Sequence, residues 1–211
     1  MAVYDLEEQE KIDELKDWWK HWGNTVIAAV SVFVIVFAGI QWWRSHQRTL
    51  AGEAAVLYGT VTKLASEGDP KKVAEAAKAL TDKYATSAYA SRAALVAAKT
   101  AFDKGDLAGA KTQLEWAVAN AKEEEIKAVA RLRLAAVLAD EKNFDAALKQ
   151  LDANNNLGFE AATAAMRGDI LFAQGKLTEA RNAYAMAIAK TDPQGDKQLL
   201  QLKLDALGAG K

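Results

Sequence analysis

The sequence contains no cysteine, two prolines and two histidines. The absence of cysteine excludes disulfide bonds, thiol catalysis and thiolate metal sites. Lys and Arg number 27 against 28 Asp and Glu, so the chain has no excess of positive charge that would favour nucleic acid as a partner. Proline is scarce, whereas Ala, Leu, Lys, Glu and Gln are abundant. This composition predicts an all-α protein, because these side chains lose little rotamer freedom in a helix.

One long apolar stretch lacks charged side chains altogether, since no Lys, Arg, Asp or Glu occurs between Lys20 and Arg44. At about 1.5 Å per residue, a helix over residues 24–43 spans roughly 30 Å, the thickness of the hydrocarbon core of a bilayer. We therefore predict a single N-terminal transmembrane helix at 24–43. Tryptophans, which favour the interface between membrane lipids and water, flank it on both sides: Trp18, Trp19, Trp22, Trp42 and Trp43.

Two other interpretations of this stretch are a buried core helix and a cleavable export signal. A helix that is apolar on every side needs a larger surrounding protein than this chain provides. Val36 and Ala38 would suit a cleavage site, but a signal should begin with a basic region. Here the first 20 residues carry seven acidic residues and three lysines, which argues against cleavage.

The flanking charges leave the orientation of the predicted helix open. Basic residues are equally frequent on its two sides, so the positive-inside rule gives no preference: Lys11, Lys16 and Lys20 precede the helix, and Arg44, Arg48 and Lys63 follow it. Residues 1–23 carry Ile12, Leu15, Trp19 and Trp22 at helical spacing. They predict a helix that either lies on the bilayer surface or continues directly into the membrane helix.

A fourfold repeat dominates the rest of the chain, residues 44–211. An apolar residue is followed three positions on by Ala and four further by another large side chain: Val73, Ala76 and Leu80; Leu107, Ala110 and Leu114; Phe144, Ala147 and Leu151; Leu177, Ala180 and Tyr184. The alanines lie 34, 37 and 33 residues apart. This is the period of the tetratricopeptide repeat, in which two antiparallel helices form one unit. The pattern predicts a tetratricopeptide-repeat α-solenoid of about four helix pairs.

The repeats differ at their turns and at the C-terminal end. Gly105 and Gly175 occupy the turn position of the second and fourth copies, whereas the first and third lack a glycine there. Pro193 lies one residue beyond the usual terminal proline of the fourth copy. After it, an apolar face predicts a C-terminal capping helix that covers the last repeat: Leu199, Leu200, Leu202, Leu204 and Leu207.

The first helix of each pair lines the concave face in tetratricopeptide arrays, which predicts a protein-binding groove. Alignment on the repeated alanines places eight residues there: Val61, Ala65, Leu95, Lys99, Leu132, Ala136, Ala165 and Asp169. This set is mostly apolar and lacks the Lys and Asn clamp by which some co-chaperones hold a terminal carboxylate. Either an apolar segment of a partner or the chain's own terminal helix could fill such a groove.

Nothing in the sequence predicts catalysis, a cofactor or a metal site. Beyond Gln47 there is no His and no Cys, so the serines have no candidate imidazole base. We therefore predict that the protein is not an enzyme.

The whole chain resembles the YfgM family of bacterial inner-membrane proteins. The likeness rests on the acidic segment EEQEKIDELKDWWKHWGN, the single apolar helix, WWRSHQ at 42–47, the four repeats and RGDILFAQGK at 167–176. The resemblance implies cytoplasmic residues 1–23, a transmembrane helix at 24–43 and a periplasmic repeat domain at 44–211. It also implies an ancillary subunit of the SecYEG translocon that associates with the periplasmic chaperone PpiD or a similar protein.

Three functional hypotheses follow. In the first, the membrane helix holds the solenoid beside the Sec translocon, where it recruits periplasmic chaperones and assists the trafficking of exported proteins. In the second, the solenoid is a tethered holdase that binds unfolded exported proteins directly, for which an exposed apolar groove would be needed. In the third, the same architecture serves as a scaffold for assembly of the cell envelope.

Overall fold

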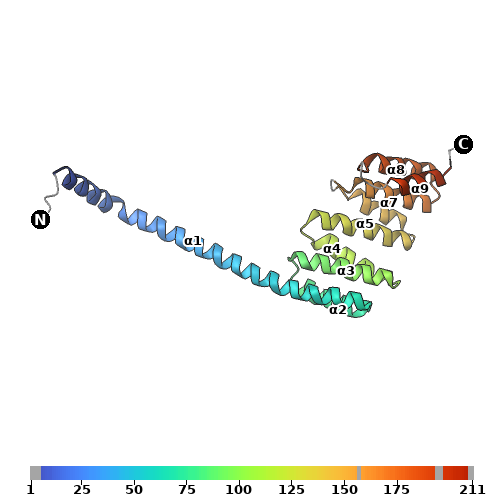
Figure 1. The fold of residues 1–211 in the computed structure, drawn as a ribbon, viewed down its shortest axis with the longest axis horizontal. Coiled ribbons are helices and arrows are strands. Elements are labelled where there is room, and N and C mark those ends of the chain that lie inside the picture. Colours follow the sequence, from blue (N-terminus) through green and yellow to red (C-terminus); the bar gives the residue numbers. More distant parts are fainter. Residues whose placement is uncertain (1–5, 156–157, 193–196, 209–211) are drawn as a thin grey trace. The chain divides into compact units, whose positions relative to one another are not determined.

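The computed structural model describes residues 6–155, 158–192 and 197–208, and these form nine α-helices without strands (Figure 1). The helices are α1 (Leu6–Glu67), α2 (Pro70–Lys83), α3 (Ala88–Asp103), α4 (Leu107–Asn120), α5 (Glu124–Asp140), α6 (Phe144–Asp152), α7 (Glu160–Ala173), α8 (Leu177–Lys190) and α9 (Gln198–Ala206). They divide into two compact units, residues 1–50 and residues 51–211. The predicted all-α class is confirmed.

The first unit contains most of helix α1. Across the described residues, α1 is the one helix that is long and apolar enough to cross a membrane, with a mean hydropathy of 2.2 in a window of which 6% is buried. Phe33 is 69% and Ile35 71% exposed, so no described part of this chain covers them, as expected of a helix that lies in lipid. The five flanking tryptophans are exposed as well. Because α1 is continuous, no break marks the predicted boundaries at 23/24 and 43/44, and this division stays a prediction.

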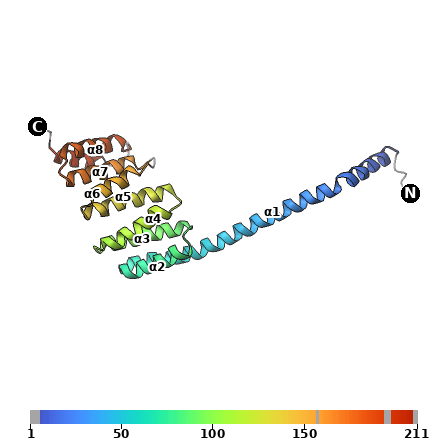
Figure 2. The ribbon, with the colours of Figure 1, turned by 180° about the vertical axis from the view of Figure 1, so that it is seen from behind.

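The second unit is a solenoid of helix pairs, which Figure 2 shows from behind. Helix α3 pairs with α4, α5 with α6, and α7 with α8. The end of α1 lies beside α2 in both views (Figures 1 and 2) and forms the first pair with it. A hydrogen bond between the side chains of Glu53 and Tyr84 joins α1 to the end of α2. The rings of Tyr58 and Tyr89, which are tilted by 41° with centroids 5.6 Å apart, join α1 to α3. This arrangement confirms the predicted tetratricopeptide-repeat solenoid of four pairs.

The repeated alanines pack in the core. Ala110, Ala147 and Ala180 are fully buried. In the first pair the equivalent residue is the fully buried Val73 and not Ala76, because the Val73 N–H donates to Asp69 O as the Ala110 N–H donates to Asp106 O. The predicted alignment of the first copy on Ala76 is therefore wrong by three residues. The main core cluster extends from α3 to α7 around large side chains that are at most 2% exposed: Leu114, Leu134, Leu151 and Ile170. A small side chain at the alanine position lets the second helix of a pair approach its neighbours closely, which explains the period of the sequence.

The turns within the pairs share one backbone geometry. Gly68, Gly105 and Gly175 have φ angles of 77°, 79° and 76°, in the left-handed region that glycine adopts without steric cost. Gly68 lies in the turn of the first pair, so the expectation that the first copy lacks a turn glycine is wrong. In the third pair Lys142 takes this position with φ 60°. The backbone N–H of Asn143 donates to Leu138 O at 2.8 Å, as that of Asp106 donates to Ala101 O at 2.9 Å. The turn is therefore built without glycine, at a cost of about 1–2 kcal/mol for a residue with a side chain.

Helix α9 covers the last pair, as predicted for a capping helix. Leu200, Leu204 and Leu207 pack against a second core cluster that includes Leu171 and Tyr184. Pro193, which the sequence places near the end of the fourth copy, lies outside the described residues.

Candidate functional site

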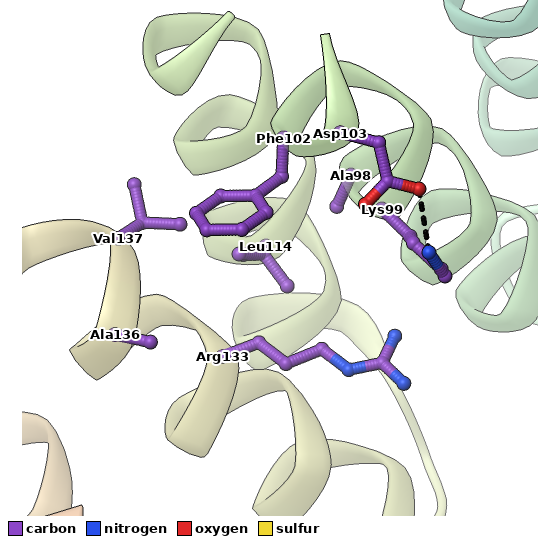
Figure 3. Close-up of a pocket in the computed structure, with 8 residues that line it drawn as sticks. All are labelled: Ala98, Lys99, Phe102, Asp103, Leu114, Arg133, Ala136 and Val137. Atoms are coloured by element: carbon purple, nitrogen blue, oxygen red, sulfur yellow. Dashed lines mark hydrogen bonds and ion pairs between the residues drawn. The ribbon is translucent and has the colours of Figure 1, made fainter. Parts of the chain in front are cut away.

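A hollow lies between α3 and α5, the first helices of the second and third pairs (Figure 3). It has a volume of about 240 Å³ and is lined by Ala98, Lys99, Phe102 and Asp103 from α3, by Leu114 from α4, and by Arg133, Ala136 and Val137 from α5. Two of the lining residues are alanines, whose small side chains leave the space between the helices unfilled. The ring of Phe102 borders this space and is 41% exposed. The arrangement is an apolar depression with an aromatic edge.

A second hollow of about 250 Å³ adjoins the first. It is lined by Tyr58 from α1, by Arg92, Leu95, Val96 and Lys99 from α3, and by Arg133 from α5. Lys99 and Arg133 line both hollows, so the two adjoin at these side chains. We call the residues that line the two hollows the α3–α5 groove.

The charges of the α3–α5 groove are unevenly paired. Lys99 Nζ lies 2.5 Å from Asp103 Oδ2, and Arg92 Nη2 lies 2.9 Å from Glu123 Oε2. Arg133 forms no ion pair with any residue that the structure describes. Figure 3 shows its side chain extending from α5 toward the α3 side of the hollow. The groove therefore has an apolar floor and one cation whose charge the fold leaves uncompensated.

The eight residues predicted to line a groove fall into three groups. Leu95, Lys99 and Ala136 line the α3–α5 groove. Four of the eight lie in the first helices of their pairs and line neither hollow of the groove. Val61 is fully buried, and three are half-buried: Ala65, Leu132 and Ala165. Asp169 lines a different hollow, at the C-terminal end of the solenoid. That the eight act as one binding site stays a prediction.

Helix α9 forms one wall of a hollow at the C-terminal end of the solenoid. This hollow has a volume of about 260 Å³ and is lined by residues of α7, α8 and α9: Asp169, Phe172, Tyr184, Lys203, Ala206 and Leu207. Lys203 Nζ donates to Asp169 Oδ1 at 2.6 Å, and Tyr184 Oη donates to the same oxygen at 2.7 Å. Burial, and then the hydrogen bond to Asp169, raise the pKa of Tyr184 above its usual value. We call the space that these residues line the α7–α9 hollow.

The residues that line the α3–α5 groove and the α7–α9 hollow show which surface the terminal helix covers. Arg181 Nη2 donates to Leu207 O at 3.1 Å and so holds the end of α9 on α8. No residue of α9 lines the α3–α5 groove. Helix α9 therefore fills the surface at the last repeat and leaves the groove at the second and third repeats uncovered.

Two prominent groove residues, Phe102 and Arg133, were not among those predicted. Phe102 lies three positions after Lys99, and Arg133 lies three positions before Ala136. Residues three apart share a face of a helix, so this spacing was the available signal. The alignment on one alanine per repeat gave two groove positions in the first helix of each pair. It missed the other residues on the same face of that helix.

A helix of membrane-spanning length followed by stacked helix pairs defines a membrane-anchored tetratricopeptide-repeat protein. The sequence comparisons agree, since a family model described as a tetratricopeptide repeat-like domain matches residues 16–209. The chain belongs to the family of ancillary SecYEG translocon subunits, which confirms the predicted resemblance.

Three relatives with that name are similar over nearly their whole length. The protein from Haemophilus influenzae is 31% identical over 97% of this chain and 100% of its own length. The protein from Neisseria gonorrhoeae is 34% identical over 98% of this chain and 100% of its own length. The protein from Escherichia coli is 30% identical over 98% of this chain and 99% of its own length. Together with the apolar α1, these likenesses support a single-pass membrane protein.

Proposed function

We propose that the protein is a non-catalytic adaptor of the Sec translocon, which binds SecYEG and links it to a PpiD-like periplasmic chaperone. The observation that carries the proposal is full-length similarity to ancillary SecYEG translocon subunits, from membrane helix to cap. The α3–α5 groove supports it, because an uncovered depression with an aromatic edge is a typical docking surface for protein segments.

The proposed topology places residues 1–23 in the cytoplasm, 24–43 in the membrane and 44–211 in the periplasm. Thiol labelling can test this topology. Because the chain has no cysteine, a single introduced cysteine supplies the only thiol. Glu10→Cys and Glu115→Cys place a thiol at exposed positions of α1 and α4. A membrane-impermeant maleimide added to spheroplasts should label Glu115→Cys and spare Glu10→Cys until the membrane is permeabilised. The opposite labelling pattern would overturn the topology.

Crosslinking tests the proposed partners. A photo-crosslinking amino acid in place of Phe102 samples the α3–α5 groove, and the same substitution at Met186 on α8 samples another exposed apolar position. In full-length protein in intact cells, position 102 should give adducts to SecYEG subunits or to an anchored periplasmic chaperone, and position 186 should give fewer. If neither position gives such adducts and the protein fails to copurify with SecYEG in mild detergent, the adaptor role is wrong.

Direct binding of unfolded exported proteins is the second candidate function. The observation that favours it is the partly exposed Phe102 beside the apolar hollow. Full-length protein in lipid nanodiscs should then suppress aggregation of a chemically unfolded model protein at stoichiometric amounts, and Phe102→Glu should remove this activity. Absence of suppression by the unmodified protein would exclude the holdase function.

A further inference from the structure

We propose that the α3–α5 groove recognises a partner segment in which a carboxylate side chain lies next to an apolar one. The apolar side chain enters the hollow beside Phe102, and the carboxylate pairs with Arg133. This inference rests on the proposed adaptor function and specifies the chemistry of the segment that docks.

The floor of the first hollow favours an apolar side chain. Leu114 and Val137 are each 2% exposed and form its base, while Ala98 and Ala136 leave room above them. A polar group placed there would lose its hydration without gaining a hydrogen-bond partner from these side chains. An apolar group would be removed from water together with part of the Phe102 ring.

The charges of the groove indicate which group of the partner should lie next to its apolar side chain. Arg92 and Lys99 are each compensated by an acid of the same fold, Glu123 and Asp103. Arg133 is not compensated by any described residue, so the three cations and two anions leave one positive charge at the groove. A guanidinium presents a planar fork of donors that matches a carboxylate in bidentate fashion. A basic segment would instead face a like charge.

The position of Arg133 sets the arrangement of the two groups. Its side chain lines both hollows, so it stands at the junction between the Phe102 side and the Tyr58 side of the groove. A carboxylate bound there has the apolar hollow on one side and Leu95 and Val96 on the other. The acid and its apolar neighbour must therefore be close in the partner's sequence.

Peptide selection with matched variants tests this chemistry. A random peptide library displayed on phage is selected on the full-length protein in nanodiscs, and the enriched peptides are synthesised for affinity measurement. Arg133→Glu reverses the proposed contact. Arg131→Glu makes the same change in net charge two residues away on α5, where the side chain lines neither hollow. Phe102→Ala is compared with Phe172→Ala, because both phenylalanines lie three residues before a turn glycine, Gly105 or Gly175.

The expected peptides carry Asp or Glu within a few residues of a large apolar side chain. Arg133→Glu should weaken their binding about tenfold, equivalent to roughly 1.4 kcal/mol, and Arg131→Glu should leave it within about twofold. Replacing the acid of the peptide by Lys should restore binding to Arg133→Glu, which a purely structural role of Arg133 would not produce. Phe102→Ala should weaken binding, and Phe172→Ala should not.

Several results would overturn the inference: enriched peptides without acids, equal binding to Arg133→Glu, or no peptide enriched on the unmodified protein. Circular dichroism of each variant establishes that it is folded. If Arg133→Glu still gives translocon adducts from position 102, the inference fails while the adaptor function stands. If the unmodified protein shows no association with SecYEG at all, the adaptor function itself fails.

Discussion

The second and fourth repeats have the same residue at one equivalent position of the first helix and residues of opposite charge at another, and the partners of these charged residues differ accordingly. Lys99 of α3 and Asp169 of α7 are equivalent, as are Phe102 and Phe172, each three residues before a turn glycine. At the second repeat, Lys99 is paired within its own helix by Asp103. At the fourth, Asp169 is paired by Lys203 of α9.

The comparison shows how one sequence pattern produces both a hollow between neighbouring repeats and a hollow walled by the terminal helix. Lys99 is paired within its own helix and draws no charged group from another element to the α3–α5 groove. Asp169 has no ion-pair partner in α7 and pairs with Lys203 of α9. This ion pair helps to hold α9 beside the α7–α9 hollow. The cap is thus positioned by charge as well as by its leucines.

The largest expected effect comes from a glycine beneath Tyr184. A Cβ added at Gly168 would lie 2.5 Å from Tyr184 Cε1, closer than atoms in contact allow. Because Tyr184 is 3% exposed and hydrogen-bonded to Asp169, its ring has little room to move. We expect Gly168→Ala to destabilise the C-terminal end by about 1–3 kcal/mol. Hydrogen exchange should show faster opening of α7 to α9, with little change in α3 and α4.

Gly59 in α1 provides the control for this substitution. An added Cβ there meets nothing within 4 Å, so Gly59→Ala should be neutral or stabilise its helix by about 0.5–1 kcal/mol. If Gly168→Ala is equally well tolerated, the close packing of Tyr184 on α7 does not hold the cap.

Alkaline pH should open the α7–α9 hollow before the α3–α5 groove. Burial and Asp169 raise the pKa of Tyr184 above the usual value of 10.0, so the folded state favours the neutral phenol. The resulting stabilisation is fully present below pH 10.0 and is lost as the pH rises through the raised pKa. Tyr184→Phe should remove this pH dependence, as measured by tyrosinate absorbance and by hydrogen exchange in α9.

Tyr89→Phe serves as the comparison, because it removes a phenol outside the α7–α9 hollow. A steep loss of α9 protection above pH 10.0 that persists in Tyr184→Phe would assign the effect to other groups, with the lysines the first to consider.

Removing the cation of α9 tests the charge contribution directly. The Lys203 and Asp169 side chains are 35% and 38% exposed, so Lys203→Met should cost only about 0.2–1 kcal/mol. The loss should appear as faster hydrogen exchange in α9. Lys99→Met breaks the equivalent pair with Asp103 and should leave exchange in α9 unchanged. Equal effects of the two variants on α9 would contradict the difference between the two repeats.

The sequence predicted the elements that depend on periodicity and length. The spacing of Ala110, Ala147 and Ala180 predicted the last three helix pairs, because a small side chain lets two helices approach closely. In the first pair Val73 holds this position, which an alignment on alanine missed. The leucines after residue 197 similarly predicted the cap. The groove was predicted only in part, since Arg133 and Phe102 depend on which helical face remains uncovered. That depends on contacts between helices far apart in the chain, such as Lys203 with Asp169, which no local pattern contains.

The smallest expected effect concerns a turn outside both hollows. Lys142 has φ 60° at the position that Gly105 and Gly175 hold in neighbouring pairs. Lys142→Gly should relieve the strain of the left-handed conformation, but the unfolded chain gains freedom, so the net stabilisation should be about 0.5 kcal/mol. Thermal unfolding should show a small rise in Tm, with peptide binding at the groove and exchange in α9 unchanged. A stabilisation that also altered either one would mean that the two regions are coupled through α5 and α6 rather than independent.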